Sequence, residues 1–289
     1  MDDATGPLKG VSVLDLTAVV LGPFATQTLG DWGADVIKVE NIEGDLARKR
    51  SVAIDLKSDQ GKDVLRRLVA DADVLVSNVR PAGMARLGFG YEACRAINPR
   101  LIYAVATGFG QDGPWRARPA FDEIIQAASG FASAMGSDEA PQFVPSLAAD
   151  KLTGMALVSA VCAALFHRER TGDGQLVEVP MMECLTSFNL AEHFFGHVYD
   201  PPTGPWSYPR VTNPKRKPYA TLDGHIGLLP YTDNQWDQFF AAAGWGDTFA
   251  KDPRFADFRV RAQHGPELFA LVEEVVRTKT TGEWLTLLK

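Results

Sequence analysis

Residues 11–40 read VSVLDLTAVVLGPFATQTLGDWGADVIKVE and combine two strand signals with one helix signal. The first six residues (11–16) and the last six (35–40) are runs of strand length that are rich in valine, leucine or isoleucine. Gly22-Pro23 opens a helix that extends to about Trp32, because proline suits the first helical turn, and Gly33-Ala34 ends it. Strand, helix and strand in this order form two parallel strands joined by a right-handed crossover. The sequence therefore predicts an α/β protein with a parallel sheet.

The same alternation continues to residue 106, with strands expected at residues 51–56, 74–77 and 101–106 and helices at 60–70, 83–87 and 91–97. After Thr107 the pattern changes: a glycine-rich turn comes first, and then helices are expected at 121–135, 151–168 and 182–198 and a strand at 175–179. Residues 200–218 are rich in proline, glycine and basic residues, and short strands (219–222, 225–229) and helices from 234 onward follow. We expect a large α/β domain over residues 1–200, a linker over 201–218 and a smaller α+β domain over 219–289.

Composition excludes several classes of function. The 289 residues carry a formal net charge of −7, which argues against broad nucleic-acid binding, because such binding needs a basic surface. The 3 cysteines are far apart and lack a paired C-x-x-C spacing, so neither a disulfide framework nor a zinc site is expected. The acidic start Met1-Asp2-Asp3 is unlike a signal peptide, and the longest apolar run, Met155–Phe166, is too short to cross a bilayer. We expect a soluble, cytoplasmic protein without a membrane or nucleic-acid partner.

No dinucleotide fingerprint follows the first predicted strand. Leu21-Gly22-Pro23-Phe24 lacks the G-x-G-x-x-G dinucleotide pattern, and no P-loop or G-x-S-x-G element occurs. His193 and His197 have the spacing of two helical metal ligands, but no glutamate follows the first histidine. Partly buried helix histidines are the favoured interpretation, so no metal site is predicted.

Asp150 is the most informative single residue. It stands between a small, apolar approach and an apolar helix that extends to about Arg168. A carboxylate here can cap the helix by accepting hydrogen bonds from first-turn N–H groups. It can also be a nucleophile that the helix N-terminus keeps ionised, an effect of roughly 0.3–1 kcal/mol. Position alone favours the cap.

A series of short motifs changes that preference. They are PLKGVSVLDL (7–16), GPFATQ (22–27), GADVIKVE (33–40), KRSVAIDLK (49–57), DVLVSNVRP (73–81), NPRLIY (98–103), GFGQDGP (108–114) and HRERTGDGQ (167–175). Each motif is weak alone, but their ordered series resembles family III CoA-transferases. The resemblance covers Pro7 to about Glu183 nearly continuously and continues more loosely to Lys289.

The resemblance implies a Rossmann-like large domain that binds CoA, a smaller second domain, and two chains interlocked as rings in a homodimer. It matches Asp150 to the catalytic aspartate. In these enzymes that residue attacks an acyl-CoA thioester to give a mixed anhydride and then becomes an aspartyl-CoA thioester. An acceptor carboxylic acid reverses these steps. CoA is thus expected as a substrate, with no tightly bound cofactor.

The resemblance also carries over the contacts with CoA, where arginine and lysine suit the phosphates. Asp122 matches the acidic neighbour of an aromatic residue that is common in the transferases. The matching CoA-binding positions are Val20, Leu21, Ile54, Asp55, Leu56, Lys57, Asn78, Val79, Arg80, Arg86 and Phe121.

Three departures from the family pattern leave alternatives. Only Leu46-Ala47-Arg48 separates Glu43-Gly44-Asp45 from Lys49-Arg50-Ser51, where transferases have a longer insert that walls the acid site. Asn41 replaces an arginine that often contacts CoA. The short insert suits the α-methylacyl-CoA racemases of the same fold, yet these need a histidine where Phe121 stands, and a phenyl ring carries no proton. The family chain also continues past Lys289, so a non-catalytic CoA-binding protein is the third possibility. The sequence favours the transferase and does not identify the acid.

Overall fold

A computed structural model describes residues 5–40, 50–204 and 206–289 and divides the chain into two compact units, Met1–Ala191 and Glu192–Lys289. The first unit contains a six-stranded sheet. Its strands are β1 (Ser12–Leu16), β2 (Asp35–Glu40), β3 (Arg50–Ala53), β4 (Val74–Ser77), β5 (Ile102–Thr107) and β6 (Gln175–Pro180).

The strands lie in the order β3-β2-β1-β4-β5-β6, and every neighbouring pair is parallel. The predicted parallel α/β sheet is therefore confirmed. The chain builds the sheet outward from β1 in one direction and then from β4 in the other. The switch point of this doubly wound sheet consequently lies between β1 and β4, where such folds bind their ligands.

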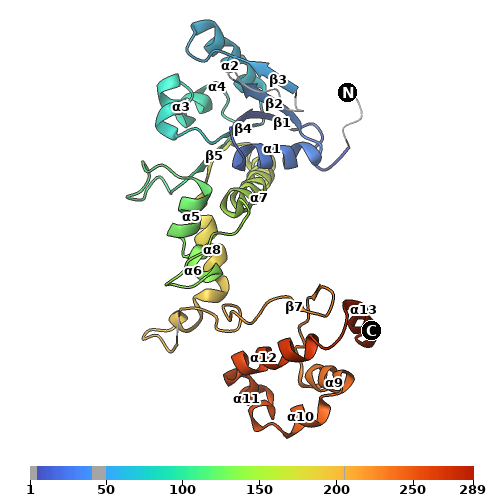
Figure 1. Ribbon diagram of the computed structural model, residues 1–289. Coiled ribbons are helices and arrows are strands. Elements are labelled where there is room, and N and C mark those ends of the chain that lie inside the picture. The colour runs from blue at the N-terminus through green and yellow to red at the C-terminus, as the bar shows by residue number, and fades with distance from the viewer. Residues whose placement is uncertain (1–4, 41–49, 205) are drawn as a thin grey trace. The chain divides into compact units, whose positions relative to one another are not determined.

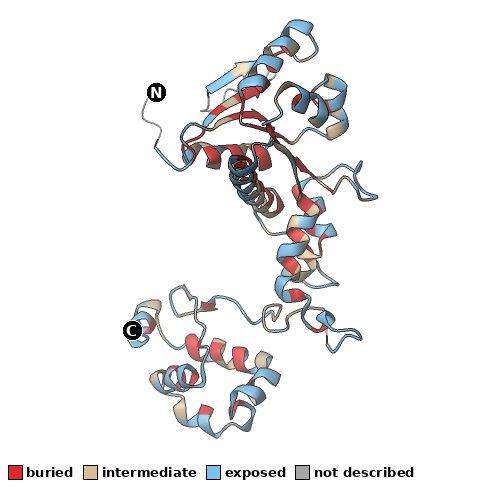
Figure 2. Ribbon diagram, turned by 180° about the vertical axis from the view of Figure 1, so that it is seen from behind, coloured by how far each residue is buried: buried red, intermediate tan, exposed pale blue. Residues whose placement is uncertain are grey.

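Two helical layers cover the sheet (Figure 1). Helices α1 (Leu21–Asp31) and α7 (Ala148–Thr171) pack on one face, and α2 (Asp59–Asp71), α3 (Pro81–Leu87) and α4 (Tyr91–Ile97) pack on the other. Side chains alternate along each strand, so Val74 and Val76 face α1 and α7 while Leu75 faces α2 to α4. Figure 2 shows the buried residues concentrated in the strands and on the helix faces that pack against them.

Two predicted helices differ from the structure. The expected helix 121–135 is two helices, α5 (Asp122–Ala128) and α6 (Phe131–Met135), because Gly130 takes a left-handed conformation with a φ of 77°. The expected helix 182–198 begins as α8 (Met181–His193) and ends there, and a 3₁₀ turn, η1 (Phe195–Val198), follows. Phe195 has a φ of 33°, which an α-helix cannot accommodate.

Helix α7 packs directly onto α1 because Gly154 has no side chain. A Cβ atom at Gly154 would lie 2.9 Å from a ring carbon of Phe24 and 3.0 Å from the carbonyl oxygen of Leu21. By length and composition α7 is apolar enough to cross a membrane, and 44% of its most apolar window is buried. Its packing on α1, β5 and β6 is that of a core helix, so its composition is weak evidence for a membrane span.

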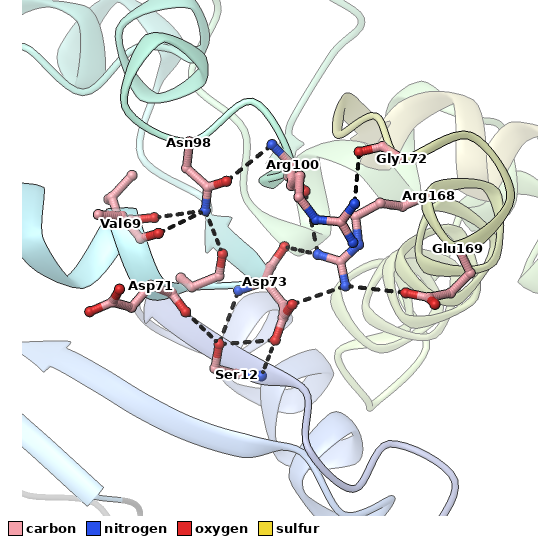
Figure 3. A network of polar contacts seen from close by, with 11 residues as sticks. Ser12, Val69, Asp71, Asp73, Asn98, Arg100, Arg168, Glu169 and Gly172 are labelled. Atoms are coloured by element: carbon pink, nitrogen blue, oxygen red, sulfur yellow. Dashed lines mark hydrogen bonds and ion pairs between the residues drawn. The ribbon is translucent and has the colours of Figure 1, made fainter.

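The C-terminal part of α7 is fixed to the amino edge of the sheet by Arg168, whose side chain is buried (Figure 3). Its Nη2 atom lies 2.9 Å from Oδ1 of Asp73, and its Nη1 atom donates to the carbonyls of Asp73 and Arg100, each at 3.3 Å. The other carboxylate oxygen of Asp73 accepts from the N–H and the hydroxyl of Ser12 at 2.8 and 3.1 Å. One guanidinium thus joins α7 to the chain entering β1, β4 and β5.

Asp150 lies near the opposite end of the same helix. Positions 150 and 168 are separated by 18 residues of continuous α-helix, a rise of about 27 Å at 1.5 Å per residue. Because Arg168 is fixed at the amino edge, the first turn of α7 lies toward the carboxyl edge of the sheet, where strand ends carry ligand sites.

The second unit contains a short antiparallel pair, β7 (Tyr219–Ala220) and β8 (His225–Ile226), which are shorter than the predicted strands. Its helices are α9 (Asp233–Ala243), α10 (Gly246–Lys251), the 3₁₀ turn η2 (Pro253–Phe255), α11 (Phe258–Gln263), α12 (Gly265–Val276) and α13 (Thr281–Leu287). Stacked aromatic rings fill its core, including Phe240 and Phe249, whose centroids are 4.2 Å apart.

Replacing Asp73 by alanine should lower the free energy of unfolding by about 2 kcal/mol, because the buried Arg168 guanidinium loses its nearest carboxylate and keeps only that of Glu169, 3.9 Å away. Urea denaturation at neutral pH measures the change. Asp63→Ala is the matched control: its pair with Arg66 is on the surface, and its loss should cost under about 1 kcal/mol. Equal losses in the two variants would show that Arg168 does not depend on Asp73.

Candidate active site

Asn78 joins the two loops on either side of the switch point. Its Oδ1 atom accepts the N–H of Ala18 at 2.9 Å, and its Nδ2 atom donates to the Ala18 carbonyl at 2.8 Å. Ala18 lies after β1 and Asn78 lies directly after β4. The two loops are therefore held side by side at the place where a doubly wound sheet receives its ligand.

A buried ion pair supports the loop after β1. The carboxylate of Asp15 accepts from the N–H and hydroxyl of Thr17 at 2.9 and 2.5 Å, and from the Thr26 hydroxyl at 2.6 Å. The ammonium of Lys38 lies 3.1 Å from Asp15 and also donates to the Thr17 carbonyl. Our sequence interpretation missed this pair. The signal was present, since an acid and a base occur in two neighbouring apolar strands, and the sheet register places them side by side.

The predicted CoA-binding residues follow several strands at the carboxyl edge. Val20 and Leu21 open α1, residues 54–57 follow β3, and residues 78–80 follow β4. Arg86 lies further along α3. The side chains of Leu21 and Ile54 are buried in the core, so these two positions offer a ligand only their backbone. Six of the predicted positions have exposed side chains: Asp55, Lys57, Val79, Arg80, Arg86 and Phe121.

Asp150 is the third residue of α7, and its backbone is held by a residue from another helix. Its N–H donates to Oδ1 of Asp122 at 2.9 Å, and Asp122 is only 3% exposed. Leu147 directly precedes the helix, and its side chain makes no capping hydrogen bond. The interpretation of Asp150 as the cap of its own helix is therefore wrong, and Asp122 satisfies the first-turn donor instead.

The same carboxylate fixes the chain that leads into α7. Oδ2 of Asp122 accepts from Nε2 of Gln126 at 2.5 Å, and Oε1 of Gln126 accepts the N–H of Val144 at 2.9 Å. Gln126 is buried, so these bonds exchange little with water. Both oxygens of Asp122 face donors, which an acceptor-only carboxylate suits and an amide would not.

The carboxylate of Asp150 accepts no hydrogen bond from the residues that the structure describes. Burial, and then the charges of Asp122 and Glu123, raise its pKa to about 6. We had expected the helix N-terminus to favour the ionised form, but desolvation and two neighbouring carboxylates outweigh it. At pH 7 the group is still mostly ionised, by roughly tenfold. It is a partly buried carboxylate with unused acceptor capacity.

Gly154 links this carboxylate to the switch point. Asp150 and Gly154 are four residues apart and share one face of α7. Gly154 packs against the carbonyl of Leu21, which is one of the predicted CoA-binding positions. Asp150 therefore lies one turn of α7 before the residue that contacts the start of α1.

Phe121 precedes α5, and its side chain is 67% exposed. The glycine-rich turn before it is fixed by two carboxylates: Glu183 accepts the N–H of Gly110 at 2.9 Å, and Glu178 accepts that of Gln111 at 2.8 Å. Within the described ranges no group of three His, Cys, Asp or Glu residues could hold a metal ion. Asn41 and the short segment 46–48 lie outside the described residues.

The comparison with known proteins decides the family. The sequence matches the profile of CoA-transferase family III over residues 8–289. The chain belongs to this family. The resemblance based on the motifs is thereby confirmed, and with it the enzyme class, an acyl-CoA:carboxylate CoA-transferase that takes CoA as a substrate.

The relatives of this family III CoA-transferase differ in the acids and acyl groups that their names give. It is 35% identical to "Probable fatty acyl-CoA transferase Rv3272" of Mycobacterium tuberculosis, over 98% of this chain and 80% of that one. The succinate–glutarate CoA-transferase of Agrobacterium fabrum is 36% identical (97% and 76% covered), and the formyl-CoA:oxalate CoA-transferase of Escherichia coli O157:H7 is 38% identical (94% and 76%). The crystal structure of Rv3272 matches with a TM-score of 0.84 at 34% identity, covering 99% of this chain and 82% of that one.

The raised pKa of Asp150 predicts a pH-dependent stability. A carboxyl pKa near 6 in the folded state and near 3.9 in the unfolded state means that folded protein binds more protons between these values, so ionised Asp150 costs stability above pH 6. Asp150→Asn should therefore raise the free energy of unfolding by about 1 kcal/mol at pH 7.5, after allowance for solvent screening. The gain should disappear near pH 4. Urea denaturation at both pH values, with the exposed Asp138→Asn as control, measures it; a gain independent of pH would contradict the account.

Proposed function

We propose that the chain moves CoA from an acyl-CoA to a carboxylic acid with Asp150 as the nucleophile. The observation that carries this proposal is the state of the Asp150 side chain. It is partly buried in the first turn of α7, one turn before the residue that contacts the start of α1, and accepts no hydrogen bond from any described residue. A carboxylate with free lone pairs can attack an electrophilic carbonyl carbon.

The chemistry proceeds in four balanced steps. An oxygen of Asp150 attacks the thioester carbonyl, the C–S bond breaks, and a mixed anhydride and CoA thiolate result. The thiolate attacks the aspartyl carbonyl of the anhydride, which leaves an aspartyl-CoA thioester and releases the donor's carboxylate. The acceptor carboxylate attacks this thioester and expels the thiolate. The thiolate finally attacks the acceptor's acyl carbonyl, which forms the new CoA ester and regenerates Asp150.

Asp122 is a positioning residue in this proposal. It holds the backbone N–H of Asp150 and, through Gln126, the chain near Val144, so the nucleophile enters the reaction with its main chain fixed. Preorganisation of this kind lowers the barrier because no reordering is needed during the attack. The negative charge of Asp122 also raises the pKa of Asp150, and a more basic carboxylate is a better nucleophile.

The CoA molecule would bind along the carboxyl edge of the sheet. The exposed cations Lys57, Arg80 and Arg86 suit its phosphates, and the backbone at Val20 and Leu21 would hold the thioester end near Asp150. Asn78 and Val79 belong to the same loop as Arg80, and residues 54–56 would contact the CoA from the loop after β3. Phe121, exposed beside Asp122, offers an apolar contact to the CoA or acyl chain.

Assembly and location are further parts of the proposal. An interlocked homodimer, with residues 1–200 as large domain, 201–218 as linker and 219–289 as small domain, would cover the apolar side chains that α7 leaves exposed, such as Met155 and Phe166. The free thiols of Cys94, Cys162 and Cys184 suit a reducing cytoplasm.

Asp150→Asn should reduce CoA transfer by at least about 10³-fold while CoA still binds, because an amide oxygen is a poor nucleophile and the predicted CoA contacts are untouched. The assay incubates an acyl-CoA panel with mixed carboxylic acids in deuterated water and reads the CoA esters by mass spectrometry. Asp138→Asn, an exposed carboxylate on the same unit, is the control. Retained transfer would reject the nucleophile. Deuterium uptake at the α-carbon of a branched acyl-CoA, without any acceptor, would instead indicate a racemase, although Phe121 stands where its second base would be.

The acid limb of the pH–rate profile should have a midpoint near pH 6, since only ionised Asp150 attacks. Glu123→Gln should move this midpoint to lower pH, because it removes an exposed negative charge that raises the pKa of Asp150 without breaking a hydrogen bond of the described network. Glu139→Gln removes another exposed charge and should leave the midpoint unchanged. If the midpoint of the acid limb does not change in Glu123→Gln, the limb reports the ionisation of a group other than Asp150.

A further inference from the structure

The second unit contains a pocket that the proposed chemistry does not use. Its volume is about 350 Å³, which falls within the range of small-molecule sites. Two basic residues, the ends of the β7–β8 hairpin and one side chain of α12 form its walls. The lining residues are Arg216, Lys217, Pro218, Tyr219, Gly227, Leu228, Leu229 and Phe269.

Arg216 is the available cation of this pocket. Lys215 and Lys217 both contact Glu273 of α12, at 3.3 and 3.1 Å, and Arg277 contacts the same carboxylate at 2.9 Å. The guanidinium of Arg216 has no ion-pair partner within the described chain. The three basic side chains that contact Glu273 carry three positive charges, and the glutamate neutralises only one of them. An anion near Arg216 therefore enters a region of net positive charge.

Tyr219 supplies a second polar group. Its side chain is nearly fully buried, and its hydroxyl makes no hydrogen bond with the part of the chain that is described. Burial and the charge of Glu273 raise the pKa of this phenol to about 12, and the charge of Arg216 acts in the opposite direction. The guanidinium is therefore within electrostatic reach of the phenol, which stays protonated and remains a hydrogen-bond donor.

The other walls are apolar. Phe269 belongs to the buried aromatic core, Leu228 packs against that core, and Leu229 lies exposed at the rim. Arg216 and Tyr219 both line the pocket, and a guanidinium and a hydroxyl can each donate to an oxygen of a carboxylate. The remaining surface offers van der Waals contact to a short hydrocarbon chain or a ring.

We propose that this pocket binds a small monocarboxylate with an apolar body, its carboxylate held by Arg216 and the Tyr219 hydroxyl, and its body packed on Leu228, Leu229 and Phe269. The inference rests on the second unit alone and goes beyond the proposed transfer chemistry. It therefore holds or fails independently of Asp150.

Calorimetric titration with hexanoate, in the absence of any acyl-CoA, tests the proposal. Wild-type protein should bind hexanoate with a Kd in the millimolar range, and 1-hexanol, which lacks the charge, should bind about tenfold more weakly or not at all. Arg216→Gln should weaken hexanoate binding by at least about tenfold. Arg259→Gln, which removes an exposed cation from the same unit, should leave it unchanged.

A second variant tests the location rather than the charge. A Cβ atom at Gly227 would meet nothing within 4 Å, and Gly227 lines the pocket, so a leucine there would narrow the pocket without a clash at its Cβ atom. Gly227→Leu should abolish hexanoate binding, whereas Gly282→Leu, at another glycine with open space, should not. Circular dichroism establishes that each variant is folded. Equal binding of hexanol and hexanoate, unchanged binding by Arg216→Gln or folded Gly227→Leu, or no wild-type binding at millimolar concentrations would overturn the proposal.

Discussion

The contact of Gly154 with α1 is the constraint on which the proposed active site depends. A Cβ atom at this position would lie 2.9 Å from the Phe24 ring and 3.0 Å from the Leu21 carbonyl oxygen, so any larger residue would force α7 and α1 to shift apart. The ion pair of the buried Arg168 guanidinium with Asp73 fixes the other end of α7 at the amino edge of the sheet. A helix held at one end and packed tightly near the other has a defined first turn, and this turn carries Asp150, four residues before Gly154.

The negative charges around the first turn of α7 favour the proposed chemistry and lower the stability of the folded protein. Asp122 accepts the N–H of Asp150 and so replaces the cap that the helix otherwise lacks. The same carboxylate, with Glu123 and partial burial, disfavours the ionised form of Asp150. Active sites commonly combine such unfavourable charges, because a desolvated carboxylate with raised pKa is more reactive than a solvated one. The surrounding fold holds the arrangement together through apolar packing on both faces of the sheet.

Sequence patterns predicted the parallel sheet well, because apolar strands such as 74–77 and glycine-ended helices leave a strong local signal. They failed where the outcome depends on contacts between distant segments. The break at Gly130 follows from one left-handed residue within an otherwise continuous helical pattern. The link from Asp122 to the Asp150 N–H spans 28 residues, so a local analysis assigned the cap to Asp150 itself. The ion pair of Asp15 and Lys38 was readable once the strands were placed in register. The CoA-binding positions came from the family resemblance, since the loop after β1 carries no G-x-G-x-x-G pattern.

The central claim is that Asp150 carries the covalent intermediate. The most direct measurement is to incubate the chain with an acyl-CoA donor, add hydroxylamine to convert an activated aspartyl group into a hydroxamate, and map the modified peptide by mass spectrometry. The account predicts a hydroxamate at Asp150 that requires the donor and is absent from Asp150→Asn. A turning-over enzyme that carries the hydroxamate on another residue, or on none, would contradict it.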